Sequence, residues 1–246
     1  DFAQASVAII KHHNPCGLAS HDDQVTAYTR AFEGDPVSAY GGIVAFNRIV
    51  DESTCESFGS TFYEVVIAPS YTPGALEVLA RRKNLRVLIA EQSEAVLDYH
   101  FIPGGLLIQT ADAIEENPDT WQVVTETKPT PQQFEDMKFA WQAAKHVKSN
   151  AIVIAGSNAL LGMGAGQPNR VTSIYLAIRA AGAKSQGSVL ASDAMFPFPD
   201  NVEAASEGGI GAIVQPGGSI RDKEIIEAAD KLSIPMVFTG IRHFKH

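Results

Sequence analysis

The clearest structural signal lies in residues 5–17, which read Ala5-Ser6-Val7-Ala8-Ile9-Ile10-Lys11-His12-His13-Asn14-Pro15-Cys16-Gly17. The apolar run over 5–10 predicts a buried strand, and a cation and an imidazole follow at its exit. Asn14-Pro15 then favours a turn, and Gly17 allows a tight one. Because ligands bind at the carboxyl ends of strands in open α/β sheets, we expect chemistry here. The alternative is an ordinary strand-end loop with two surface histidines.

The composition limits the class of protein. The chain has 246 residues and 45% hydrophobic content, enough to bury a large core, and its formal net charge of −9 argues against a nucleic-acid partner. No apolar run approaches the roughly 20 residues that span a bilayer, so we expect no membrane partner. The two cysteines, Cys16 and Cys55, exclude an all-cysteine zinc site and do not indicate a disulfide framework. We expect a cytoplasmic protein, and the start at Asp1 indicates a processed or truncated chain.

Strand and helix signals alternate along the chain. Apolar runs predict strands at 7–10, 42–46, 62–68, 85–90, 106–109, 151–155, 160–163, 188–191, 212–215 and 235–239. Helical spacing and capping residues predict helices at 24–32, 73–83, 130–147, 171–181, 202–207 and 223–229. This order favours an α/β fold of two units, with parallel or mixed sheets flanked by helices on both faces. We place the units at 1–127 and 128–246.

Two further loops carry unusual residues. The glycine-rich loop that ends at Arg170 precedes a helix, so its backbone amides could hold an anion; the alternative is a tight hairpin exit. The apolar run Met195-Phe196-Pro197-Phe198 lies where a polar loop is expected. It either packs as core or forms a slot for a flat ligand.

Taken together, these loops resemble one family along essentially the whole chain. The matching motifs are Lys11-His12-x-Asn14-Pro15-Cys16-Gly17, Asp35-Pro36-x-Ser38-Ala39-Tyr40-Gly41-Gly42, Glu64-Val65-x-Ile67-Ala68-Pro69, Val147-Lys148-Ser149-Asn150-Ala151-Ile152, Gly164-Ala165-Gly166-Gln167-x-x-Arg170, Ser192-Asp193-Ala194, Phe196-Pro197-Phe198, Gln215-Pro216-Gly217-Gly218-Ser219 and Arg242-His243-Phe244-x-His246. The chain thereby resembles the 5-aminoimidazole-4-carboxamide ribonucleotide (AICAR) formyltransferase part of the bifunctional purine biosynthesis family.

The resemblance implies transfer of a formyl group from 10-formyltetrahydrofolate, a cosubstrate, to the 5-amino group of AICAR. That amine is a poor nucleophile because its lone pair is delocalised, so a base must take its proton. His12 fits the base, since an unperturbed imidazole has a pKa of about 6.5. Lys11 fits as the cation that stabilises the oxyanion. Adjacent residues of an extended strand point to opposite faces, so the two side chains converge only if the chain bends there.

The resemblance also implies a binding site and partners. The residues at substrate-contacting positions are Gly41, Glu64, Asn150, Arg170, Met195, Arg242 and His246. Glu64 could instead pair with a nearby lysine. The family further implies a homodimer with sites at the subunit interface, units similar to cytidine deaminase, and a monovalent cation (K⁺) near Ser149, Asp193 and His246. Zinc deaminase chemistry is disfavoured, because Cys16 has no second cysteine three residues later.

The sequence departs from the family in two ways. Nothing resembles the inosine monophosphate (IMP) cyclohydrolase domain or the transferase's own first segment, so we expect a C-terminal portion of a longer protein. Met195 stands where many relatives carry Phe, which weakens stacking but keeps an apolar surface. Three functions stay open: an active formyltransferase, a catalytically silent fragment that binds AICAR or folate, and an unrelated nucleotide-binding α/β enzyme.

Overall fold

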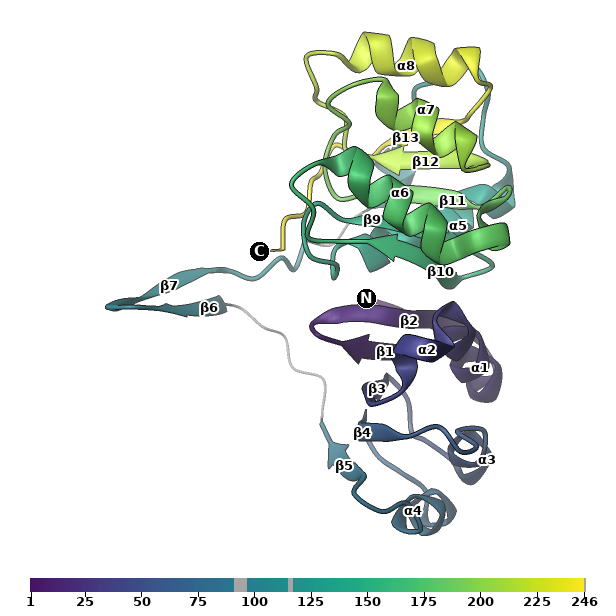
Figure 1. The fold of residues 1–246 in the computed structure, drawn as a ribbon, viewed down its shortest axis with the longest axis vertical. Coiled ribbons are helices and arrows are strands. Elements are labelled where there is room, and N and C mark those ends of the chain that lie inside the picture. Colours follow the sequence, from purple (N-terminus) through teal and green to yellow (C-terminus); the bar gives the residue numbers. More distant parts are fainter. Residues whose placement is uncertain (91–96, 115–116, 246) are drawn as a thin grey trace.

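A computed structural model describes residues 1–90, 97–114 and 117–245 of the chain. Within these residues, eleven strands form one mixed sheet in the order β5-β4-β3-β1-β2-β10-β9-β11-β12-β13-β8 (Figure 1). A separate small sheet pairs β6 with β7. The mixed α/β architecture with flanking helices confirms the predicted fold class. The similarity of the two units to cytidine deaminase stays a prediction.

The first half of the large sheet contains a hairpin followed by a parallel run. Its elements are β1 (Ala5–Lys11), β2 (Asn14–His21), α1 (Gln24–Gly34), α2 (Pro36–Ala39), β3 (Gly42–Phe46), α3 (Glu52–Glu56), β4 (Tyr63–Ala68), α4 (Pro73–Ala80) and β5 (Arg86–Ile89). β1 pairs antiparallel with both β2 and β3, and β3, β4 and β5 are parallel.

The second half follows the two-stranded arm. Its elements are η1 (Pro118–Thr120), β8 (Gln122–Val123), α5 (Pro131–Ala144), β9 (Ile152–Gly156), β10 (Ala159–Gly164), α6 (Arg170–Ala181), η2 (Gly182–Ser185), β11 (Val189–Ser192), α7 (Asp200–Glu207), β12 (Ala212–Gln215), α8 (Asp222–Lys231) and β13 (Met236–Phe238). β9 pairs antiparallel with β10 and β11, and β11, β12 and β13 are parallel.

The two halves therefore repeat one strand order. The series β2-β1-β3-β4-β5 has the same pairing directions as β10-β9-β11-β12-β13. Both hairpins turn on two residues with positive φ, His12–His13 (52° and 68°) and Ser157–Asn158 (52° and 55°). Positive φ at both central positions defines a type I′ turn, which matches the twist of the flanking strands.

In each hairpin, a glycine in the second strand lets a helix pack closely against that strand. A Cβ on Gly17 of β2 would lie 2.0 Å from the carbonyl oxygen of Ala31 in α1. A Cβ on Gly162 of β10 would lie 2.3 Å from the carbonyl oxygen of Ala177 in α6. Only glycine fits at either contact, so the same device packs α1 and α6 in the two halves.

The halves meet where β2 and β10 pair antiparallel at Ala19 and Ala159, beside a hydrogen bond from the Ser20 N–H to the Asn158 carbonyl (2.9 Å). In the first half, α1 to α4 lie on one face of the sheet (Figure 1) and enclose a core that includes Tyr28 and Tyr63. In the second half, α5 covers one face and α6, α7 and α8 cover the other. Helices on both faces are thus confirmed for the second half.

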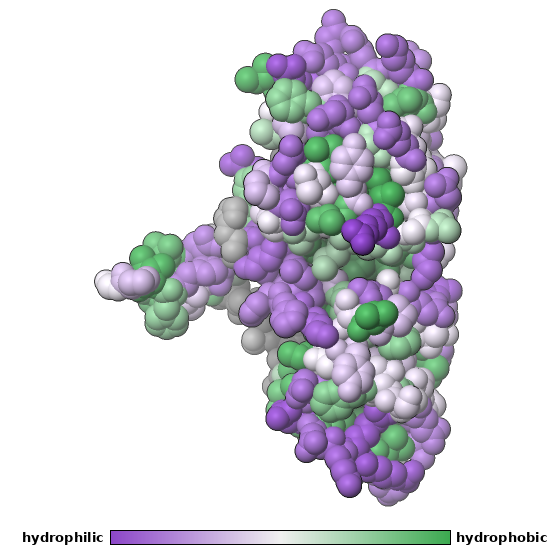
Figure 2. Space-filling model, viewed as in Figure 1, coloured by the Kyte–Doolittle hydropathy of each residue, from purple (hydrophilic) through white to green (hydrophobic). Residues whose placement is uncertain are grey.

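A two-stranded arm projects from the body of the molecule (Figure 1). β6 (Leu97–Ile102) and β7 (Gly105–Thr110) are exposed at every residue. Their apolar side chains colour most of the arm's tip in the space-filling view (Figure 2). Phe101 is 88% exposed, an unusual setting for a phenylalanine.

The predicted turn at Asn14-Pro15 is wrong. The chain reverses one step earlier, at His12–His13, and Asn14 and Pro15 begin β2. Pro15 is accommodated because it pairs with Ile10 at a register shift, where a ladder hydrogen bond is already interrupted. Gly17 serves close packing rather than turning. The boundary at 127/128 stays a prediction, although β8, which precedes it, pairs with β13 of the second half.

Candidate functional site

The predicted site residues share one edge of the eleven-stranded sheet. At this edge β1, β10, β11 and β13 end, and β3, β4 and β9 begin. These strand ends carry Lys11, His12, Gly41, Glu64, Asn150, Arg170, Met195 and Arg242. His246 lies outside the described residues. One edge therefore gathers residues that are up to 231 positions apart in sequence.

Lys11 and His12 line the same pocket, of about 210 Å³, at the seam between the halves. The bend that their convergence requires is the type I′ turn itself, in which His12 has positive φ. The opposite wall is β10, which contributes Leu160, Gly162 and Met163. One pocket is therefore lined by both the lysine and the histidine of this turn.

Backbone contacts hold Lys11 in place. Its Nζ donates a hydrogen bond to the Tyr40 carbonyl oxygen at 2.6 Å. The next residue, Gly41, has φ +70° and donates its N–H to the Phe62 carbonyl at 2.8 Å. Because a Cβ disfavours that φ, glycine at 41 fixes the turn that aims the Tyr40 carbonyl at the ammonium. Gly41 thus orients Lys11 through the backbone.

A second cluster surrounds Arg170. Its guanidinium is buried (6% exposed) and bonds Asp193 at 2.5 Å, the Ser192 hydroxyl at 2.8 Å and the Asn150 side-chain oxygen at 2.8 Å. Asn150 in turn donates to the Gln167 carbonyl at 2.8 Å. Arg170 begins α6, where the helix dipole disfavours a cation, and Asp193 supplies the counter-charge. These contacts fix the orientation of the Asn150 side chain.

The expected cation site borders this cluster. The Ser149 hydroxyl donates to Asp193 Oδ2 at 3.0 Å, and the Ser149 N–H bonds the Lys245 carbonyl at 3.0 Å. Burial and then the neighbouring Lys148 ammonium lower the pKa of Lys245. Asp193 already has Arg170 as counter-charge, and no group of three or more His, Cys, Asp or Glu side chains in the described part of the chain is arranged around a metal. The K⁺ site stays a prediction.

One hydrogen bond joins the two clusters. The Asn14 side-chain oxygen, beside the turn, accepts the Lys148 N–H at 3.1 Å. Lys148 immediately precedes Ser149 and Asn150, so the first half's hairpin is tied to the second half's site loop.

Three predicted residues lie apart from these clusters. Glu64 pairs with Arg86 at 2.6 Å, an arginine in place of the lysine considered from sequence. Met195 is 38% exposed, and Phe196 beside it is fully buried, so the apolar run divides between surface and core. Arg242 is exposed and lies over the Phe244 ring at 5.2 Å. Substrate binding by these residues stays a prediction.

Sequence reasoning assigned no role to other residues that line the Lys11 pocket, among them Cys16, Asp35, Ser38 and Met163. Asp35 caps α2 by accepting the Ser38 N–H at 2.9 Å. Burial, and then the Asp35 carboxylate, raises the pKa of the Cys16 thiol to about 11. Asp35 and Ser38 belong to the motif Asp35-Pro36-x-Ser38 that carries the family resemblance, so the sequence did contain an indication that they lie near the site. Met163 reaches the Lys11 pocket only because β10 pairs with β2, which the sequence does not reveal.

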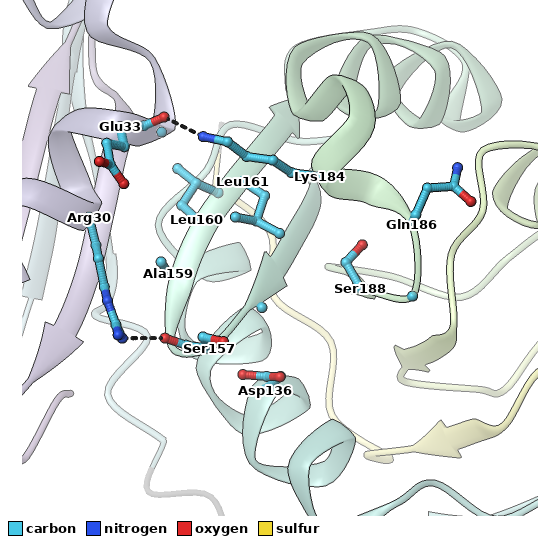
Figure 3. A pocket seen from close by; sticks show the side chains of 13 residues that line it. Arg30, Glu33, Asp136, Ser157, Ala159, Leu160, Leu161, Lys184, Gln186 and Ser188 are labelled. Carbon is cyan, nitrogen blue, oxygen red and sulfur yellow. Dashed lines mark hydrogen bonds between the residues drawn. The ribbon is translucent and has the colours of Figure 1, made fainter.

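A second pocket, of about 470 Å³, adjoins the first along β10 and shares Gly34 and Leu160 with it (Figure 3). Two cations on its walls bridge the halves: Arg30 Nη1 donates to the Ser157 carbonyl at 3.2 Å, and Lys184 Nζ to the Glu33 carbonyl at 2.8 Å. None of the predicted site residues lines this pocket. These contacts stabilise the seam next to the candidate site.

Fold and site define a mixed α/β protein with a duplicated sheet and a lysine–histidine pocket at its seam. In addition, none of the helices in the described ranges has the length and apolarity to traverse a bilayer. A family model described as "AICARFT/IMPCHase bienzyme" matches residues 1–180. The chain belongs to this family, as the motif resemblance predicted.

Curated relatives are similar in sequence along essentially the whole chain. "Bifunctional purine biosynthesis protein PurH" of Thermoanaerobacter sp. (strain X514) is 52% identical over 247 residues, covering 100% of this chain and 49% of that protein. The proteins of the same name from Bacillus cytotoxicus and Streptococcus thermophilus are 51% and 50% identical, over 100% and 98% of this chain and 49% and 48% of theirs. The chain spans about half the length of the curated relatives it matches. The solved structure "Acinetobacter baumannii RibD, form 2" aligns with a TM-score of 0.28 at 17% identity, over 43% of this chain and 33% of that one, a likeness too slight to carry an argument.

Proposed function

We propose that the chain carries the AICAR formyltransferase activity of a purine biosynthesis enzyme, with 10-formyltetrahydrofolate as cosubstrate. The observation that supports this most is the convergence of Lys11 and His12 on one pocket. Family membership supports the substrate class, since the matching relatives are named as bifunctional purine biosynthesis proteins. In the full-length protein, IMP cyclohydrolase would be the second activity.

The two side chains divide the chemistry of formyl transfer. His12 accepts the proton that the AICAR amine loses as its nitrogen bonds to the formyl carbon. Lys11 places its positive charge where the formyl oxygen becomes an oxyanion. When the oxyanion collapses, the bond to folate N10 breaks, and His12 returns the proton to that nitrogen. The products are formyl-AICAR and tetrahydrofolate, with atoms and charge balanced.

The other predicted residues hold the substrate. Asn150 has both donor and acceptor atoms at the same sheet edge, and Arg170 orients it. Glu64, Met195 and Arg242 extend the proposed binding set from neighbouring strand ends, and His246, which lies outside the described residues, belongs to the set by family resemblance. Ser149 and Asp193 are the groups through which a K⁺ would act.

A second copy of the chain is part of this proposal. A lone two-stranded hairpin is marginally stable in water, and the arm's apolar side chains, such as Phe101, have no cover in the described chain. A homodimer that buries the arm would stabilise it. Sites at the subunit interface would then receive residues from both copies.

The test compares two neighbouring histidines in the full-length protein. His12 lines the Lys11 pocket, whereas His13, the next residue of the same turn, lines a groove elsewhere. Asparagine tolerates positive φ, so His12→Asn and His13→Asn are matched in the backbone. We expect His12→Asn and Lys11→Ala each to slow turnover roughly 100- to 1,000-fold and His13→Asn to change it less than threefold.

Turnover is followed by the absorbance of released tetrahydrofolate, and AICAR binding by calorimetry. Equal effects of His12→Asn and His13→Asn would remove His12 from its role. AICAR binding without turnover by the 246-residue chain alone, beside turnover by the full-length protein, would instead support the catalytically silent alternative.

A further inference from the structure

A buried histidine lies beside the candidate site without a role in the proposed chemistry. His243 follows Arg242 in the segment after β13, and it is only 2% exposed. Its ring Nδ1 lies 2.7 Å from Oδ2 of Asp112, a residue 131 positions earlier in the chain. Because a carboxylate only accepts hydrogen bonds, Nδ1 is the donor. The pair therefore joins two distant segments through one hydrogen bond to a charged group.

Asp112 lies at the root of the two-stranded arm, residues 111–114. It comes two residues after β7, and the arm leaves the body of the molecule beside the segment that contains His243 (Figure 1). Ala113 and Ile114, which follow Asp112, are exposed. The hydrogen bond to His243 thus anchors an exposed part of the chain to the second half.

The second half holds His243 from two further sides. Its ring packs against Trp141 of α5, with ring centroids 5.0 Å apart. Its backbone N–H donates to the carbonyl oxygen of Asp193 at 2.9 Å. Trp141 belongs to the core beneath α5, and Asp193 is the buried counter-charge of Arg170. His243 therefore connects the root of the arm to the Arg170 cluster of the candidate site.

The segment that carries His243 runs along the site edge of the sheet. It begins where β13 ends, and farther along Lys245 donates its N–H to the Ser149 hydroxyl at 3.2 Å. Arg242, the residue before His243, is exposed and belongs to the proposed binding set. The contacts of His243 thus set the backbone position of Arg242.

We propose that His243 is a positioning residue for substrate binding, because its hydrogen bond to Asp112 holds Arg242 where the guanidinium meets AICAR. This inference rests on the proposed function, in which Arg242 contacts the substrate. Without the bond, the segment would populate conformers in which Arg242 is displaced, and the apparent dissociation constant rises as the competent fraction falls. Loss of one hydrogen bond to a charged group is enough to raise that constant about tenfold. Lys11 and His12 line a pocket that does not include His243, so the turnover of bound substrate should stay the same.

The first test measures AICAR binding by calorimetry and steady-state kinetics in the full-length protein. His243→Leu keeps an apolar side chain against Trp141 but removes the donor. His243→Asn keeps an amide nitrogen near the position of Nδ1 but loses the ring. We expect His243→Leu to raise the dissociation constant and the KM for AICAR about tenfold, and to change kcat less than threefold.

His243→Asn should bind AICAR within about threefold of the wild type, although the smaller side chain makes it unfold at a lower urea concentration than His243→Leu. A purely structural role for His243 would reverse this order, because binding would then follow stability. That reversed order would overturn the proposal, and so would wild-type affinity in His243→Leu.

Asp112 provides the second test. Asp112→Ala should weaken AICAR binding as much as His243→Leu does, and the double variant should bind no more weakly than either single variant, because both changes remove the same bond. Asp119→Ala, at an exposed carboxylate seven positions along the same connection, is the matched control and should change binding less than twofold. Losses that multiply in the double variant, or an equal loss in Asp119→Ala, would contradict the proposal.

Hydrogen exchange of residues 239–245 gives a readout without substrate. His243→Leu and Asp112→Ala should each speed exchange there at least tenfold, whereas Asp119→Ala should not; unchanged exchange in the first two would overturn the positioning role. If the wild type and these variants bind AICAR and transfer the formyl group equally well, the proposed function stands and only the role of His243 fails. A wild-type protein that neither binds AICAR nor transfers the formyl group would remove both.

Discussion

Removing the charge of Arg170 tests whether its role is structural. Arg170→Met keeps most of the side-chain volume but leaves Asp193, which is 1% exposed, without its counter-charge. It also removes the donors to the Ser192 hydroxyl and the Asn150 oxygen. The family resemblance gave Arg170 a role in substrate binding. Its buried contacts predict instead that loss of the guanidinium lowers the stability of the protein even without a ligand.

The magnitude follows from the burial of the pair. Breaking a buried ion pair by removing one partner costs about 3–5 kcal/mol, because the remaining charge stays desolvated. We expect Arg170→Met to lower the free energy of unfolding by about that amount. Asp193→Asn should have a similar effect, since it strands the guanidinium at the N-terminus of α6. The double variant has no buried charge, so its loss should be smaller than the sum of the two single losses by at least about 2 kcal/mol.

The assay is urea unfolding, followed by tryptophan fluorescence and by far-ultraviolet circular dichroism. A variant at an exposed pair, Glu224→Gln, serves as the control and should change the free energy by less than about 1 kcal/mol, because its partner Arg221 is exposed. Additive single effects, or single losses near those of Glu224→Gln, would refute the reasoning. Arg170 would then be free to serve substrate.

Three further outcomes follow from packing, burial and exposure. Gly17→Ala should lower the free energy of unfolding by about 1–3 kcal/mol, because its Cβ would overlap α1, whereas Gly105→Ala, with 3.9 Å of space, should lower it by less than about 0.5 kcal/mol in the same urea titration. Burial raises the pKa of the Cys16 thiol from 9.0 to about 11, so above pH 9 the folded state keeps a proton that the unfolded state releases. The free energy of unfolding should therefore fall between pH 9 and 11, by up to about 2.7 kcal/mol. Cys16→Ala should remove that part of the pH dependence. Phe101→Ser on the arm should weaken self-association at least tenfold in sedimentation equilibrium of the full-length protein, and an unchanged dissociation constant would exclude the arm from the dimer interface.

Local signals were sufficient for most elements. The strands at 42–46 and 212–215 have the predicted bounds, and the helix expected over 130–147 is α5, which begins at Pro131 behind a capping box at Thr130. These segments combine periodic apolar residues with clear end signals. β2 was missed because Pro15 interrupts its pattern and because two histidines form its type I′ turn in place of Asn-Gly.

The site was predictable only as a set of residue types. Strand order determines that Gly41, Asn150 and Arg170 share an edge with Lys11, and that order arises from pairings such as β2 with β10, which no local pattern encodes. The burial of Arg170 is likewise a tertiary property, because an arginine at a helix start is usually exposed. No local residue pattern shows that the two units repeat one strand order, because the halves share their pairing and turn geometry rather than their residues.

The duplication also bears on why the proposed catalytic residues lie on one side of the seam. Each hairpin turn opens on a pocket: Lys11 and His12 of the first turn on one, Gly156 and Ser157 of the second on the other. The backbones of the two turns are alike, so the difference lies in the side chains. Glycine and serine offer neither a base nor a cation. The second pocket's cations, Arg30 and Lys184, donate to carbonyls of the opposite half, whereas Lys11 donates to a carbonyl of its own half and lies next to His12. A repeated fold thus supplies two equivalent pockets: one has the residues that we propose for proton transfer, and the other has cations that bind carbonyls across the seam.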